Sequence, residues 1–179
     1  MLKIAIVGNI ASGKSTVEKI IESKGFNVYD SDKIAHEILA SKEEVKQRFG
    51  TVDRKELAKI VFSNMSKLKE LESIIHPLVK QEIENIFQRA KETVFISVPQ
   101  LFEAGFEPLF DKIIYVTAEK KFRLERLMKR NNLTKEEALV RINAQKEDEK
   151  IEKSDFVIQN NNSLNDLEKE VENVLNKLN

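Results

Sequence analysis

The sequence predicts an α/β protein with a parallel five-stranded sheet flanked by helices, carrying a helical insertion and a small helical lid. Three observations support this prediction. Short apolar runs alternate with helical patterns, which is typical of parallel sheets. A glycine-bounded loop joins the first apolar run to the first helical pattern. The third run, residues 93–98, is almost wholly apolar, as a central parallel strand is.

The loop between the first strand and the first helix matches the phosphate-binding pattern G-x-x-x-x-G-K-[ST] over residues 8–15. The apolar run 2–7 precedes it and a helical pattern begins at Thr16, so its flanks disfavour a chance match. Loop amides and a helix N-terminus can surround a polyphosphate there. Lys14 is expected to reach the β- and γ-phosphates, and the Ser15 hydroxyl to hold Mg²⁺. The residues expected to bind ATP in this loop are Gly8, Ala11, Ser12, Gly13, Lys14, Ser15 and Thr16.

Composition excludes several classes of protein. At 179 residues the chain corresponds to one domain, or one domain with small insertions. Its 30 basic and 30 acidic residues leave no net charge to attract nucleic acid. No apolar run approaches the ~20 residues of a membrane span, and Met1 leads directly into the first strand without a signal peptide. The absence of cysteine suits a reducing compartment, so we expect a cytoplasmic protein.

Two carboxylates follow the second predicted strand, residues 26–29. Asp30 and Asp32 lie where this strand ends, at the edge where open α/β sheets bind ligands. A second interpretation is that Ser31 or Asp32 caps the helix that follows. The two interpretations are compatible, and both stay open.

Residues 41–90 show helical patterns and no strand pattern, which predicts a helical lobe over the sheet. The longest pattern is expected to break at His76-Pro77, because proline disfavours helix at the preceding residue. A lone histidine in this position is more often structural than catalytic.

Two further strands are predicted at residues 93–98 and 112–116, and the loop 99–105 follows the first of them. Thr117 is expected to cap the next helix, whose Arg123, Arg126 and Arg130 share one face. These arginines are either a solvated basic face or part of a lid that closes on phosphates. The phosphate loop favours the lid.

The chain then predicts a second lid helix, a last strand and a last helix. Residues 131–133 break the first lid helix, and a capping box at 134–137 opens the second, which carries Arg141 and Gln145. Residues 155–158 form the fifth strand. The last amphipathic helix starts at Ser163.

With these motifs in place, the chain resembles the dephospho-coenzyme A kinase family. The shared motifs occur in order along the whole chain: residues 8–16; 30–35; 49–50 followed by 53–54, Leu57 and 61–62; 71–72 with 76–77; 99–103; the arginine spacing 123, 126, 130 and 141–142 with Gln145; and 155–160. Each motif alone is weak, but seven in register are specific.

The resemblance implies transfer of the γ-phosphate of ATP to the ribose 3′-hydroxyl of dephospho-CoA, with Mg²⁺. Asp32 would be the catalytic base, while Lys14 and Arg141 would stabilise the transferred phosphoryl group, Arg141 also binding ATP. The residues implied for the acceptor site are Asp32, Asp53, Arg54, His76, Leu101, Phe102 and Glu103.

The resemblance also implies one P-loop kinase domain over residues 1–179, with an acceptor-binding lobe at 33–90 and a lid hairpin at 118–147. The expected partners are ATP and dephospho-CoA, without nucleic acid or membrane, in a monomer or small homo-oligomer. The chain departs from the family pattern in three places. Asn9 and Ala11 stand where glycines are usual, Gln100 replaces a leucine, and the segment between Leu39 and Asp53 is short.

Other functions fit the sequence less well. A nucleoside monophosphate kinase would lack the long helical insertion after the second strand. A GTPase needs D-x-x-G and N-K-x-D at strand ends, and the Asn176–Asn179 match lies in a helix. An ATP-driven motor would have an acidic residue closing the third strand, where Val98-Pro99 stands.

Overall fold

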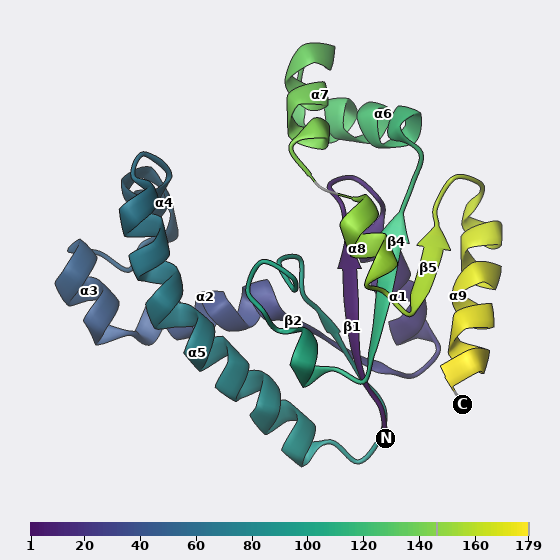
Figure 1. Cartoon of the computed structure of the whole chain (residues 1–179), viewed down its shortest axis with the longest axis horizontal. Helices are drawn as coiled ribbons and strands as arrows, with labels where there is room; N and C mark the ends of the chain where they lie inside the picture. Colours follow the sequence, from purple (N-terminus) through teal and green to yellow (C-terminus); the bar gives the residue numbers. More distant parts are fainter. Residues whose placement is uncertain (146, 179) are drawn as a thin grey trace. The chain divides into compact units, whose positions relative to one another are not determined.

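The computed structural model describes residues 1–145 and 147–178, which belong to two compact units. The first unit comprises residues 1–29 and 91–179, and the second comprises residues 30–90. The first carries the sheet, and the second is helical (Figure 1).

The sheet has five strands in the order β2-β3-β1-β4-β5, which confirms the predicted α/β fold. β1 lies at the centre and pairs in parallel with β3 and β4, in a register that sets Ile6 beside Ser97 and Gly8 beside Val116. The carboxyl ends of these strands therefore share one edge. The strands are β1 (Lys3–Gly8), β2 (Asn27–Asp30), β3 (Val94–Ser97), β4 (Lys112–Thr117) and β5 (Phe156–Gln159).

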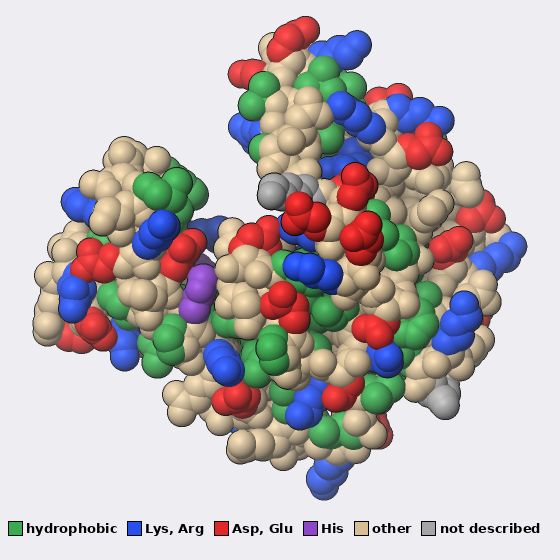
Figure 2. Space-filling model, in the orientation of Figure 1, with side chains coloured by type: hydrophobic (Ala, Val, Ile, Leu, Met, Phe, Trp, Pro, Cys, Tyr) green, Lys and Arg blue, Asp and Glu red, His purple; other side chains and the backbone are tan. Residues whose placement is uncertain are grey.

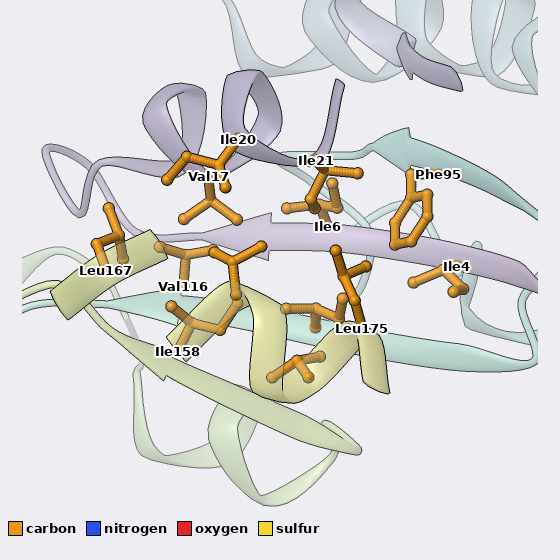
Figure 3. Close-up of a cluster of buried hydrophobic side chains, with 13 residues drawn as sticks. Ile4, Ile6, Val17, Ile20, Ile21, Phe95, Val116, Ile158, Leu167 and Leu175 are labelled. Carbon is orange, nitrogen blue, oxygen red and sulfur yellow. The ribbon is translucent and has the colours of Figure 1, made fainter. Parts of the chain in front are cut away.

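Two helices of the first unit, α1 and α9, cover one face of the sheet. Figure 3 shows their apolar side chains meeting those of β1, β3, β4 and β5. Phe95, Ile21 and Ile158 are fully buried at this contact. The helices of this unit are α1 (Lys14–Ser23), α6 (Lys120–Asn131), α7 (Lys135–Asn143), α8 (Asp148–Glu152) and α9 (Leu164–Leu178), with a 3₁₀ turn at Glu107–Leu109.

The second unit contains α2 (Ser31–Ser41), α3 (Glu43–Phe49), α4 (Arg54–Phe62) and α5 (Met65–Arg89). The predicted break at His76-Pro77 is wrong, because Pro77 lies inside the continuous α5. Proline costs an interior helix position about 3 kcal/mol through one lost donor and a clash. α5 packs on α2 and α4, and its Ile75 and Val79 are buried on either side of the proline. This packing offsets the local cost.

The region after β4 also differs from the prediction. Thr117 does not cap α6, because this helix begins at Lys120, directly after Glu119. The Thr117 hydroxyl donates a hydrogen bond to Glu147 instead. The short helix α8 was not predicted, because five residues are too few for a periodic pattern. The predicted capping box at Thr134 and Glu137 is present at the start of α7.

No helix among the described residues is both long enough and apolar enough to cross a membrane. On the face shown in Figure 2, basic and acidic side chains are interspersed, and no continuous basic area is visible.

Candidate active site

The loop between β1 and α1 passes through two left-handed residues. Gly13, directly before α1, has a φ of +93°, and Ala11 has a φ of +59°. The left-handed region costs a residue with a Cβ about 1–2 kcal/mol, a cost that glycine avoids. Ala11 is one of the positions where the family resemblance leads us to expect glycine. The alanine therefore keeps the loop conformation at the expense of strain.

Every backbone carbonyl from Asn9 to Gly13 accepts a hydrogen bond. Those of Asn9 and Gly13 accept from backbone N–H groups within the loop or the first turn of α1. The other three accept from side chains more than 100 residues away. These bonds are Arg123 Nε to Ile10 O (3.1 Å), Arg126 Nη1 to Ala11 O (3.5 Å) and Ser12 O (3.3 Å), and Asn160 Nδ2 to Ser12 O (2.9 Å).

Several backbone N–H groups of the same loop, by contrast, have no hydrogen-bond acceptor among the described residues. Among the described residues, nothing accepts a hydrogen bond from the backbone N–H of Ala11, Gly13, Lys14 or Ser15. The first N–H groups of any helix lack partners within that helix. Because the loop carbonyls are all paired, the unpaired groups here are donors, at the positive end of the α1 dipole. This is the arrangement that binds an anion.

Arg123 connects the loop to the lid and to the segment after it. The residue is 2% exposed, and its guanidinium donates to Ile10 O, to Glu147 Oε2 at 2.7 Å and to Gln145 Oε1 at 3.2 Å. Gln145 Oε1 also accepts the N–H of Ile10 at 2.9 Å. Every one of these contacts links elements distant in sequence, so the network holds the loop against the base of α6.

Tyr115 of β4 is buried near the same network. Burial, and next the negative charge of Glu147, raises the pKa of Tyr115 well above its usual range. The phenol therefore stays protonated at any ordinary pH and cannot serve as a proton acceptor.

Asn160, directly after β5, packs against the glycine that opens α1. A Cβ built on Gly13 would lie 2.0 Å from Asn160 Nδ2, well inside contact distance. The buried side-chain amide of Asn160 donates from Nδ2 to Ser12 O, and the backbone carbonyl of Asn160 accepts from Arg126 Nη2 at 2.9 Å. Position 13 thus requires glycine for two reasons: its φ is positive, and Asn160 occupies the space that a Cβ would need.

Lys14 is the first residue of α1. Its ammonium donates to Glu18 Oε1 at 2.7 Å and to the hydroxyl of Ser97, at the end of β3. The Lys14 side chain is 19% exposed. Its charge is therefore held against the Glu18 carboxylate and the Ser97 hydroxyl rather than in bulk water. Ser15, expected to be the magnesium ligand, is exposed on the next position of the helix.

Arg141 lies in the last turn of α7, on the second helix of the lid. It is exposed, and among the described residues its guanidinium makes no hydrogen bond or ion pair. Arg130 is also exposed, and in the described part of the chain it bonds the Asn131 side chain alone, at 2.9 Å. The arginines of α6 therefore do not act alike: Arg123 and Arg126 bind loop carbonyls, and Arg130 is a surface residue.

The loop after β3 carries three residues implied for the acceptor site. Leu101 is fully buried, so its side chain packs inside the protein and supports the loop. Phe102 is half-buried, with the Lys153 ammonium 5.9 Å from its ring centre. Glu103 is exposed and pairs with Lys150 at 2.5 Å.

The remaining expected site residues lie in the second unit. Asp30 caps α2, accepting the N–H of Asp32 at 2.8 Å, so neither Ser31 nor Asp32 is the cap. Asp32 is exposed in the first turn of α2. Asp53 caps α4, which begins at Arg54, and both are exposed. His76 is half-buried within α5.

Sequence reasoning missed what Arg126 and Asn160 do. Both stood in segments that the family resemblance singled out, but Asn160 had no assigned role, and Arg126 was expected on a solvated face or in a lid that closes on phosphates. Their spacing from the loop, 114 residues for Arg126 and 148 for Asn160, carries no local signal.

A phosphate loop at the end of a central parallel strand, with a helical lid anchored on it, defines a P-loop nucleotide-binding protein. Solved shikimate kinases share this fold; that of Acinetobacter baumannii is 16% identical, with a TM-score of 0.58 over 99% of this chain and 93% of its own.

The dephospho-CoA kinase family model matches residues 2–166, so the chain belongs to the dephospho-CoA kinase family. The dephospho-CoA kinases of Listeria monocytogenes and Fusobacterium nucleatum are 41% and 42% identical; each match covers 94% of this chain, and 92% and 94% of those proteins. The solved dephospho-CoA kinase of Campylobacter jejuni is 34% identical, with a TM-score of 0.76 over 98% of this chain and 96% of its own. A solved Thermus thermophilus protein reaches a TM-score of 0.86 at 37% identity, over 99% and 98% of the two chains.

Gly13→Ala is expected to weaken ATP binding more than about tenfold, or ~1.4 kcal/mol, because its Cβ must displace Asn160 and so release Ser12 O. The matched control is Gly25→Ala, whose φ of +92° imposes similar strain in open space. Titration calorimetry gives both affinities. Equal affinities of the two folded variants would contradict the account of the loop.

Proposed function

We propose that the chain is a dephospho-CoA kinase that transfers the γ-phosphate of ATP to the ribose 3′-hydroxyl of 3′-dephospho-CoA, giving CoA and ADP, the last step of coenzyme A biosynthesis. Membership of the family gives the acceptor. ATP binding is supported by the loop between β1 and α1. The backbone carbonyls of residues 9–13 all accept hydrogen bonds, and the N–H groups at the start of α1 have no acceptor among the described residues.

The phosphoryl transfer assigns a task to three side chains. The acceptor oxygen attacks the γ-phosphorus while the bond to the β,γ-bridging oxygen breaks, and negative charge spreads over the oxygens. Lys14 and Arg141 supply positive charge to these oxygens, Lys14 from the loop and Arg141 from the lid. Asp32 accepts the proton of the acceptor hydroxyl. Asp32 is exposed in the first turn of α2, whose N-cap is Asp30.

Mg²⁺ is the metal proposed to accompany ATP. The Ser15 hydroxyl at the start of α1 fits this ion, which prefers oxygen ligands and keeps several waters beside substrate phosphates. When bound, the ion neutralises charge on the phosphates.

We assign the acceptor to the residues that the family resemblance implies for it. Asp53, Arg54 and His76 lie on the helices of residues 30–90, and Phe102 and Glu103 lie on the loop after β3. Residues 33–90 would form the acceptor lobe and residues 118–147 the lid of one P-loop kinase domain spanning residues 1–179. A cytoplasmic monomer or small homo-oligomer without nucleic-acid or membrane partners completes the proposal.

The direct test incubates the protein with Mg-ATP and dephospho-CoA, AMP, pantetheine or no acceptor. Formation of ADP and the mass of each acceptor are followed. A phosphoryl group gained by dephospho-CoA alone supports the proposal. Preferred phosphorylation of AMP would favour a nucleoside monophosphate kinase instead.

Lys14→Ala is expected to lower kcat by about 10²–10³-fold, because one charged group commonly contributes ~3–4 kcal/mol to such a transition state. Lys19→Ala, at an exposed position of the same helix, is the control and should keep wild-type kcat. A Lys14→Ala enzyme that keeps more than about a tenth of wild-type kcat, a loss of only ~1.4 kcal/mol, would exclude the proposed role.

Asp32→Asn is expected to lower kcat by about 10²–10⁴-fold at saturating Mg-ATP and dephospho-CoA, as for loss of a general base. Its melting temperature should hardly change, because Asp30 caps α2. Glu37→Gln removes an exposed carboxylate from the same helix and serves as the control. If the Asp32→Asn enzyme stayed within tenfold of wild type, another group would have to accept the proton.

A further inference from the structure

The strand beside the phosphate loop ends without a carboxylate. In P-loop NTPases, Mg²⁺ is held by the loop hydroxyl together with an acidic residue from a neighbouring strand. Here β3 ends at Ser97, which the sheet register sets beside Ile6, two residues before the loop. Ser97 is 1% exposed, and Val98 and Pro99 follow it. A neutral hydroxyl therefore occupies the end of this strand.

Glu18 brings a carboxylate to the same place from α1. Lys14 Nζ donates both to Glu18 Oε1, at 2.7 Å, and to Ser97 Oγ, so one ammonium joins the carboxylate to the strand end. The Glu18 side chain is only 17% exposed. It follows Lys14 by four positions and Ser15 by three, and residues at these spacings share one helix face. The Glu18 carboxylate therefore lies on the same face of α1 as Lys14, which is assigned to the phosphates, and Ser15, which is assigned to Mg²⁺.

An ordinary surface ion pair does not explain this placement. On a helix, a lysine four residues before a glutamate is the weaker of the two orders. A carboxylate beside the phosphate lysine also opposes the binding of polyanionic ATP, because like charges at close range repel. A divalent cation between the carboxylate and the phosphates turns this repulsion into attraction.

We propose that Glu18 supplies the carboxylate that β3 lacks and, with the Ser15 hydroxyl, supports Mg²⁺ bound to ATP. The two oxygens match the ion's preference for one or two protein ligands beside phosphates and water. The pairing of Glu18 with Lys14 holds both side chains in place before the nucleotide binds. This inference rests on the proposed kinase function, but it concerns the metal and not the acceptor.

The test measures how much Mg²⁺ strengthens binding of a non-hydrolysable ATP analogue, as the ratio of the Kd in EDTA to the Kd in Mg²⁺. Glu18→Gln is expected to lower this ratio at least about tenfold, while its affinity in EDTA stays the same or improves. Glu22→Gln, at an exposed position one turn further along α1, is the control and should match wild type. A ratio for Glu18→Gln within twofold of the control would overturn the proposal and leave Glu18 a counter-ion of Lys14.

A second variant tests the position of the charge. Glu18→Gln combined with Ser97→Asp moves the carboxylate to the end of β3 and should recover most of the lost ratio. A folded double variant, judged by its melting temperature, that recovers nothing would contradict the equivalence of the two positions. No acceptor is present in these titrations. An unexpected result in the acceptor screen would therefore count against the assigned substrate and not against Glu18.

Discussion

The hydrogen bonds from Arg123, Arg126 and Asn160 to the loop carbonyls are the constraint on which the site depends. A loop that turns its N–H groups toward an anion must turn carbonyls away from it, and a carbonyl left without a donor costs about 1–3 kcal/mol. Backbone N–H groups pair only the carbonyls of Asn9 and Gly13 among the five from Asn9 to Gly13. Side chains from α6 and from the residue after β5 supply the rest.

This constraint links α6 to the phosphate loop. Because Arg123 and Arg126 donate hydrogen bonds to the loop, they fix the start of α6 to it. Arg141, on α7, is exposed. The same constraint explains Gly13, since the amide that binds Ser12 O fills the space beside its Cα. Ala11 shows the opposite case: the held loop imposes a left-handed conformation on a residue with a Cβ.

The sequence predicted what local patterns encode. The phosphate loop, the strands and the capping box at Thr134 each lie within a few consecutive residues, and all three are present. What depended on distant packing was missed. Pro77 continues α5 because its neighbours pack on other helices, and Thr117 binds Glu147 instead of capping α6. Asp30 and Asp32 both precede or open a helix, and only the observed hydrogen bonds identify Asp30 as the cap. Glu18 stands four residues from Lys14 in the sequence, but the role proposed for its carboxylate depends on the contact of Lys14 with Ser97, 83 residues further along the chain.

The most direct test of the constraint is hydrogen exchange of the loop amides in the nucleotide-free protein. Arg126→Met removes the donor to Ala11 O and one of the two donors to Ser12 O. Arg130→Met removes an exposed arginine one turn further along α6, whose one hydrogen bond among the described residues is to Asn131. The N–H groups of Ser12 and Thr16, which are bonded within the loop and first turn, report on the loop's shape. We expect them to exchange at least about tenfold faster in Arg126→Met than in Arg130→Met, a loss of ~1.4 kcal/mol of local protection. Equal exchange in the two variants would contradict the claim that α6 holds the phosphate loop in its binding conformation.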